Sequence, residues 1–321
     1  MPALVDLAAS QSEKAILVFD GKNLELACQA APMLAAMGRN VRVVDDMRTQ
    51  SSLEPYRIEL NPFGATVASY ARDPRDIIFS SETLAHAMIE EPSQEQRNKY
   101  WRAGPRLLIE FCNCVMLKRN LERATPGATS AILADPQMLI TYAEIVAEEG
   151  NPLLKTQARA ILAMQDHEHF GQHMEEASRA TRIFMPGTRL ADVGNEAKHP
   201  HDSLIREEAI VFLGGPQARM SRLGTYYARH IQSFCDALYA GAGVLRAICD
   251  EFTNMPLKSL VESLTTLRAF GGEFHMIAQS RSEILRKYGQ HETATLEDNA
   301  IVKIWLGFSS FEEAKRISEA A

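Results

Sequence analysis

The sequence lacks several patterns that would define its chemistry directly. No Gly-x-x-x-x-Gly-Lys-Ser/Thr occurs in the 321 residues, so the loop whose backbone amides cradle nucleotide phosphates is absent. No Gly-x-Ser-x-Gly occurs either, which leaves a hydrolase triad of the nucleophile-elbow type without support. No window approaches the roughly twenty apolar residues that a membrane span needs, and the N-terminus has no basic-then-apolar signal peptide.

Cysteine pairs and a positive charge balance are also missing. Five cysteines with no repeated Cys-x-x-Cys spacing argue against a disulfide framework or a structural zinc site, and they favour a reducing, cytosolic setting. The net charge of -7 and the pI near 5.8 exclude a global field that attracts nucleic acid or an anionic membrane. Any contact with DNA must therefore be local.

The chain has enough length and apolar content, 46% of its residues, to bury a sizeable core. Short apolar or β-branched runs predict strands, and longer periodic segments predict helices. The expected strands are 15–19, 41–44, 209–213, 244–249, 273–278 and 301–306, and the expected helices are 24–37, 82–89, 107–121, 136–148, 153–164, 224–239 and 256–268. Helices dominate the middle of the chain. This predicts an α/β domain in two parts, 1–64 and 204–321, interrupted by an all-α insert at 65–203.

The most informative segment is the apolar run 244–249, which ends in two adjacent acids, Asp250 and Glu251. Such a run predicts a buried parallel strand with carboxylates at its C-terminal tip, where open α/β sheets bind ligands. In P-loop ATPases one acid there helps to hold Mg²⁺ on the phosphates, and a neighbouring acid polarises the attacking water. The alternative is a pair of solvated acids at a helix entrance.

The segment after the acids has the order of elements that a RecA-like nucleotide site needs. A predicted helix runs to Arg268, Gly271 and Gly272 break it, and a second strand ends at Gln279.

Four segments resemble the type IV secretion coupling proteins, which are conjugative DNA-transfer ATPases. Residues 248–289 resemble the second half of their ATPase domain, and 15–46 resemble their strand, Asp-Pro-Lys-Gly-Glu-type turn, helix and second strand. Residues 57–64, with Asn61-Pro62, resemble an Asn-Pro-hydrophobic element of the family. Residues 100–111, with Trp101, resemble the helix ahead of its all-α insert.

The resemblance implies a RecA-like P-loop NTPase sheet, without its N-terminal P-loop strand, that carries an inserted all-α domain. It implies ATP and Mg²⁺ as cofactors, with Asp250 organising the Mg²⁺ through the nucleotide and Glu251 activating water. Gln279 resembles a glutamine that senses the γ-phosphate. Arg268 resembles an arginine presented to the nucleotide of a neighbouring subunit.

The early turn and the missing loop complete this expectation. Asp20 and Lys22 occupy the turn that the family places near substrate or nucleotide. Because residues 1–10 resemble the segment next to the family's phosphate loop on its C-terminal side, we expect Met1 to be an internal methionine of a longer protein, or the chain to be a truncated relative. Alone, the chain is expected to be incompetent for ATP hydrolysis. If the strand before the loop is also missing, we expect exposed apolar strand edges and aggregation.

The family resemblance also implies partners and a location. It implies a homohexamer that delivers a relaxase with its DNA, or protein effectors, to the components of a type IV secretion channel. It places the chain at the cytoplasmic face of the bacterial inner membrane, tethered only by an anchor upstream of Met1. Two alternatives remain: a non-catalytic cargo-binding adaptor, and a helicase-like or septal DNA translocase.

One cluster invites a metal interpretation. His167, His169 and His173 lie among acids, but they do not form His-Glu-x-x-His, and their spacing does not put all three on one helical face. A polar loop or helix end is the expectation there.

Overall fold

The computed structural model describes residues 14–89, 99–198, 200–254 and 258–307, together with 314, 315 and 318. Residues 1–10, on which part of the family resemblance rests, and Pro256, where the sequence predicts the start of a helix, lie outside these ranges. No helix within them combines the length and the apolar composition needed to span a membrane.

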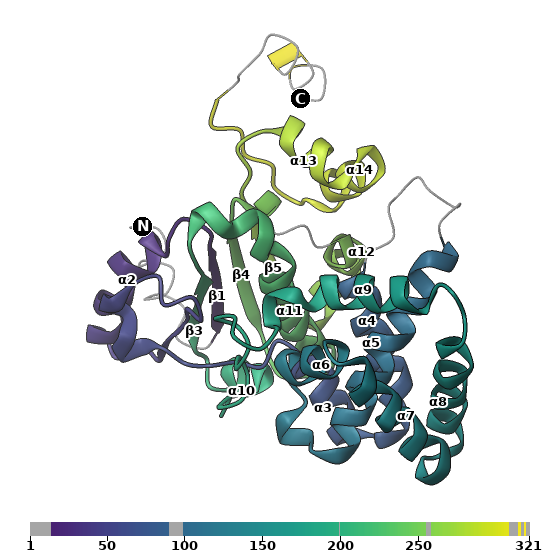
Figure 1. The fold of residues 1–321 in the computed structure, drawn as a ribbon. Helices are drawn as coiled ribbons and strands as arrows, with labels where there is room; N and C mark the ends of the chain where they lie inside the picture. The colour runs from purple at the N-terminus through teal and green to yellow at the C-terminus, as the bar shows by residue number, and fades with distance from the viewer. Residues whose placement is uncertain are drawn as a thin grey trace.

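Five strands form one sheet in which every neighbouring pair is parallel. The strands are β1 (Ala15–Asp20), β2 (Val41–Val44), β3 (Ile210–Gly214), β4 (Leu245–Asp250) and β5 (Gly272–Met276), and their spatial order is β2-β3-β1-β4-β5 (Figure 1). Because all the strands run the same way, their carboxyl ends lie at one edge of the sheet. The acids at the end of β4 are therefore brought beside the turn that leaves β1.

The central strand β1 is buried along its whole length because both faces of the sheet are covered. Its side chains alternate between two apolar clusters. Ile16 and Val18 pack with α2 (Glu25–Ala36), while Leu17 and Phe19 pack with α11 (Met220–Tyr239). Figure 1 shows these two helices on opposite sides of the sheet.

The remaining helices around the sheet come from residues 201–299. They are α10 (His201–Arg206), α12 (Lys258–Leu267), α13 (Arg281–Tyr288) and α14 (Gln290–Asn299). Short 3₁₀ helices connect elements throughout the chain: η1 (Ser51–Tyr56), η2 (Pro74–Asp76), η3 (Leu121–Arg123), η4 (Arg182–Phe184), η5 (Gln217–Arg219), η6 (Phe252–Asn254) and η7 (Arg268–Phe270).

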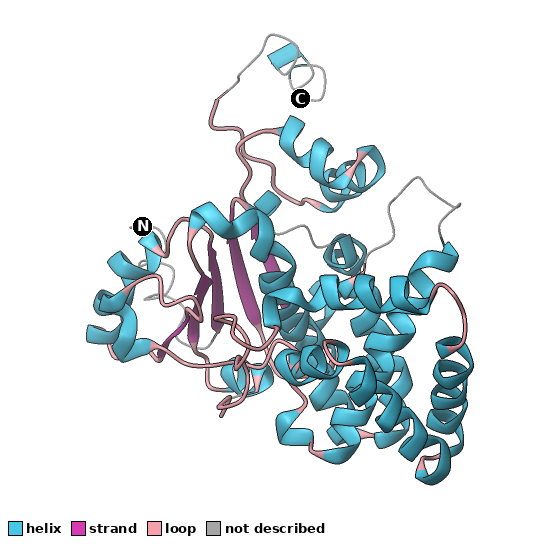
Figure 2. Ribbon diagram, viewed as in Figure 1, coloured by secondary structure: helices cyan, strands magenta, loops and turns pink. Residues whose placement is uncertain are grey.

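Between β2 and β3 in the sequence most of the described chain is helical (Figure 2). This part consists of α3 (Gly64–Arg72), α4 (Ile77–Met88), α5 (Lys99–Arg119), α6 (Pro126–Leu133), α7 (Pro136–Glu149), α8 (Pro152–Gln165) and α9 (Phe170–Thr181). It has its own apolar cluster, which includes Leu108, Phe111 and Ile161. The expected α/β fold with an all-α insert is confirmed, whereas the exact domain boundaries stay a prediction.

The strand predicted at 301–306 is wrong. These residues form no strand, and Ile301, Ile304 and Leu306 are 75%, 77% and 97% exposed. A β-branched apolar run becomes a strand only when a neighbouring strand supplies hydrogen bonds. Within the described residues no strand lies beside this run.

Candidate functional site

The two acids lie at the carboxyl edge of the sheet. Asp250 is the last residue of β4 and is paired in register with Asp20 of β1. Glu251 comes next with a φ of 51°, in the left-handed region that non-glycine residues seldom adopt. This turn carries the Glu251 side chain inward, and the residue is only 6% exposed. Strained backbone of this kind is concentrated at functional sites.

Three side chains hold the Glu251 carboxylate. Lys22 Nζ lies 2.8 Å from Oε1, Gln279 Nε2 donates to the same oxygen at 2.5 Å, and Asn254 Nδ2 donates to Oε2 at 3.2 Å. Burial by itself would raise the pKa of Glu251, but the bonds from Lys22 and Gln279 outweigh it and hold the pKa below its ordinary value. Glu251 is therefore an ionised carboxylate in a mostly buried position. That is the state a proton acceptor requires.

Lys22 links the turns after β1 and β4. It sits in a tight turn in which Asn23 and Leu24 both have positive φ, at 56° and 59°. Its Nζ is also 3.9 Å from Asp250 Oδ2. The bond to Glu251 raises the pKa of Lys22, so the ammonium is charged. The site thus contains one cation between two carboxylates.

Asp20 has a different environment from Lys22. Its side chain is fully buried and accepts the backbone N–H groups of Lys22 at 3.3 Å and Ala27 at 3.1 Å. Burial raises the pKa of Asp20 to about 6, although these hydrogen bonds oppose the shift. Through these two hydrogen bonds the carboxyl group stabilises the first turn of α2 and the turn that carries Lys22.

The structure does not bring Arg268 to this cluster within one chain. Arg268 opens η7, which precedes β5, so it lies at the amino edge of the sheet, opposite the edge where Glu251 lies. Its side chain is exposed. Gln279, in contrast, lies just beyond the carboxyl end of β5 and reaches Glu251 directly.

Sequence reasoning missed Asn254. It belongs to η6, the 3₁₀ turn after the acids, and its backbone N–H also donates to Glu251 O at 2.8 Å. The available signal was its position three residues beyond Glu251, which places the two side chains on one face of a helical turn.

Two histidines of the cluster lie against one aromatic ring. The centroid of the Trp101 ring is 4.7 Å from that of His169 and 5.9 Å from that of His173, which is buried on α9, close to Gly104. The described part of the chain contains no group of three or more His, Cys, Asp or Glu side chains arranged to hold a metal ion.

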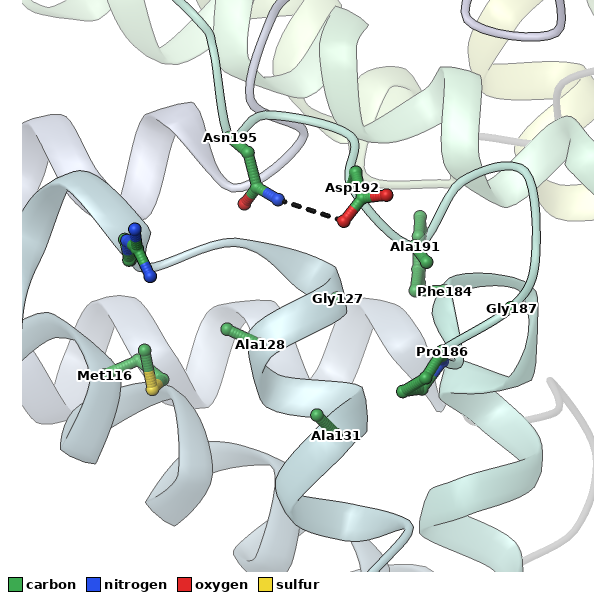
Figure 3. Close-up of a pocket in the computed structure, with 11 residues that line it drawn as sticks. Met116, Gly127, Ala128, Ala131, Phe184, Pro186, Gly187, Ala191, Asp192 and Asn195 are labelled. Atoms are coloured by element: carbon green, nitrogen blue, oxygen red, sulfur yellow. Dashed lines mark hydrogen bonds between the residues drawn. The ribbon is translucent and has the colours of Figure 1, made fainter.

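A cavity of about 410 Å³ lies in the helical part, between α6 and the segment after η4 (Figure 3). Small and apolar residues such as Ala128, Ala131 and Pro186 form much of its wall. Asn195 Nδ2 donates to Asp192 Oδ1 at 3.3 Å beside it. None of the residues around Glu251 lines this cavity, so it is separate from the acid cluster.

The acid cluster fits one side of a magnesium–nucleotide complex. The Asp250 side chain is 20% exposed, so a hydrated cation can approach it, and Lys22 supplies a positive charge for a phosphate. The amide cradle for the β- and γ-phosphates is the part that the sequence does not contain.

Comparison with known proteins agrees with this picture. Residues 244–321 match the family model described as the TraM recognition site of TraD and TraG. The fold is similar to three solved structures of the bacterial conjugative coupling protein TrwB. One is the unbound TrwBdeltaN70, with a TM-score of 0.53 and 13% identity, covering 90% of this chain and 68% of that one.

The other two TrwB structures contain nucleotides. The complex with the GTP analogue GDPNP has a TM-score of 0.52 at 13% identity, covering 90% of this chain and 69% of that one. The complex with ADP and Mg²⁺ has a TM-score of 0.52 at 14% identity, covering 93% of this chain and 70% of that one. No curated protein matches the sequence. The family match thus covers the C-terminal quarter of the chain, and the similarity to TrwB shows a shared fold.

Proposed function

We propose that this chain is the ATPase segment of a type IV secretion coupling protein, which delivers DNA–protein or protein substrates to the secretion channel. The observation that carries the proposal is the cluster at the carboxyl edge of the sheet. There Lys22, Asp250, Glu251 and Gln279 come from the ends of three adjacent strands. This is the edge at which open α/β sheets bind ligands.

Each residue has a role that its surroundings support. Asp250, whose side chain is 20% exposed, would orient a hydrated Mg²⁺, and this ion would neutralise charge on the phosphates. Glu251, ionised and fixed by three donors, accepts the proton of the attacking water. Gln279 donates a hydrogen bond to Glu251 and would sense the γ-phosphate. Asp20 fixes the turn that carries Lys22.

The sequence lacks the phosphate loop, with its amide cradle and its lysine, so we propose that the chain does not hydrolyse ATP alone. The competent form is a homohexamer that also has a phosphate loop at each nucleotide site. In that ring the exposed Arg268 of one subunit reaches the nucleotide of the next, which is consistent with its separation from Glu251 within one chain.

The C-terminal segment supplies the contact with the transfer machinery. The matched family is described by its recognition of TraM, so we propose that residues 244–321 contact a protein of the DNA-processing complex. The chain then works at the cytoplasmic face of the inner membrane.

Phosphate release from ATP tests the proposal. We expect none from the chain alone. A longer form, in which a Gly-x-x-x-x-Gly-Lys-Ser/Thr loop precedes Met1, should turn over ATP. In that longer form Glu251→Gln should bind ATP no more weakly than the wild type and should lower kcat by about 100-fold or more, because the proton acceptor is lost.

Glu273→Gln is the matched control for this experiment. It changes an acid on β5 that pairs with Lys14 and Arg246 instead, so it should keep most of the activity. Undiminished hydrolysis by Glu251→Gln would falsify the assignment.

The second candidate is a non-catalytic adaptor. It is favoured by the match to a partner-recognition family in residues 244–321, combined with the lack of a phosphate loop in the sequence. Nucleotide binding separates the two: an adaptor binds the partner protein with the same affinity whether or not ATP and Mg²⁺ are present.

A further inference from the structure

The ion pair between Lys22 and Glu251 joins two residues with unequal freedom. The Glu251 side chain is 8% exposed and is held by Gln279 and Asn254, in addition to Lys22. The Lys22 side chain is 40% exposed, and a lysine has four flexible methylene groups between backbone and charge. If the pair separates, Lys22 is therefore the member that moves.

The position of Lys22 gives it access to a second partner. Its ammonium is 3.9 Å from Asp250 Oδ2, at the edge where the proposed nucleotide would present its phosphates. A triphosphate carries several negative charges, whereas the Glu251 carboxylate carries one. A phosphate that enters this edge competes with Glu251 for the same ammonium group.

We propose that Lys22 is an exchangeable latch: it holds the Glu251 carboxylate when no nucleotide is bound, and it transfers to the terminal phosphate of a magnesium nucleoside triphosphate. This inference rests on the proposed nucleotide site and adds a control step to it. After the exchange Glu251 keeps its hydrogen bonds to Gln279 and Asn254 but loses its counter-charge, which makes it a stronger proton acceptor. Lys22 is thus a positioning residue: when it binds the phosphate, Glu251 becomes a stronger proton acceptor.

A double-mutant cycle on equilibrium binding tests the exchange without any turnover. The probe is a non-hydrolysable ATP analogue with Mg²⁺, and the protein is the full 321-residue chain. Glu251→Gln frees Lys22 in advance, so it should tighten binding about 5-fold, the size of a partly exposed ion pair. Lys22→Gln should weaken binding. The double variant should bind no more tightly than Lys22→Gln, because the gain from Glu251→Gln requires the lysine.

The chain contains a matched control for this cycle. Lys14 forms an equivalent ion pair, at 3.0 Å, with Glu273 of β5. Lys14→Gln removes a positive charge close to the same sheet without touching Glu251, and it should leave the affinity unchanged. A weakening equal to that of Lys22→Gln would indicate a general charge effect and would overturn the latch.

The outcomes separate the latch from the proposed function. If the analogue binds and the effects of Glu251→Gln and Lys22→Gln are additive, the exchange is wrong while the nucleotide site stands. If the wild-type chain and all variants show no binding at millimolar analogue, the nucleotide site of this chain is contradicted and the exchange fails with it. A folding check by thermal unfolding identifies any variant whose loss of binding reflects loss of structure.

Discussion

At the residue scale, burial has opposite consequences for two kinds of ionisable group in this protein. Glu251 is buried with donors around it and stays charged. His201 and His230 are buried against each other, with His201 Nε2 and His230 Nδ1 3.1 Å apart, and no carboxylate hydrogen-bonds either ring among the contacts of the described residues. A neutral pair can share one hydrogen bond, whereas two protonated rings would repel each other.

This histidine pair should make the fold sensitive to acid. Burial lowers the pKa of His201 to about 3 and that of His230 well below its usual value. A base whose folded pKa is depressed contributes stability above its unfolded pKa of about 6.5, and that contribution is lost as the pH falls from there. We expect His201→Gln to reduce the loss of unfolding free energy between pH 7 and pH 4 by about 3 kcal/mol.

Urea unfolding at several pH values measures this difference. The exposed His291 provides the control, because His291→Gln should reproduce the wild-type pH dependence. The same acid sensitivity in His201→Gln and wild type would show that the pair does not govern the acid response.

The residues of the site were only partly predictable. Asp250 and Glu251 were located by the apolar run before them, and Gln279 by the end of the next strand. The contact of Lys22 with Glu251 depends on β1 lying directly beside β4, which is a tertiary pairing between segments more than two hundred residues apart. No local sequence pattern predicts that β1 pairs with β4. The left-handed backbone conformation of Glu251 could not be predicted from the sequence either.

At the element scale, helix starts are encoded locally. An acid followed by proline, as at Asp135-Pro136, predicts a capped helix with proline in its first turn. In the structure Asp135 Oδ1 accepts the backbone N–H groups of Gln137 at 3.0 Å and Met138 at 3.2 Å. These interactions involve only neighbouring residues, which is why the sequence predicts them.

The cap gives a clean stability prediction because Asp135 is exposed and its hydrogen bonds are made to the first turn of α7. Asp135→Ala should lower the free energy of unfolding by about 1 kcal/mol, the usual value of an N-cap. Chemical denaturation measures the difference. Asp166→Ala is the control: Asp166 is also exposed but lies at the C-terminus of α8, where an acid opposes the helix dipole. Equal losses in the two variants would contradict the cap assignment.

Strands are less reliably encoded than helices. The runs at β1 and at 301–306 are both apolar and β-branched, yet only β1 is a strand, because β3 and β4 pair with it on both sides. The local composition of a segment indicates that it can form a strand, but it forms one only if a neighbouring strand pairs with it.

At the scale of the whole molecule, the exposed apolar run at 301–306 should lower the solubility of the chain. Ile301, Val302, Ile304 and Leu306 are each more than 70% exposed within one short segment. Exposed segments of this composition promote association between chains. Ile304→Lys should therefore raise the concentration at which the chain aggregates, and it should leave the thermal midpoint unchanged because Ile304 contributes little to the core.

Light scattering during concentration measures this effect. Lys303→Gln is the neighbouring comparison: it removes the charge that interrupts this apolar run, so it should lower solubility instead. A fall in solubility with Ile304→Lys would show that the exposed run is not the source of association.

The carboxyl edge of β4 is where a magnesium nucleotide should bind, and equilibrium binding of a non-hydrolysable ATP analogue with and without Mg²⁺ tests this central claim most directly. We predict that the analogue binds and that Asp250→Asn weakens binding about 10-fold in Mg²⁺, since a cation-orienting carboxylate is lost. Without Mg²⁺ the same substitution should not weaken binding of the analogue. Equal affinities for wild type and Asp250→Asn in Mg²⁺, or no binding by either, would contradict the claim.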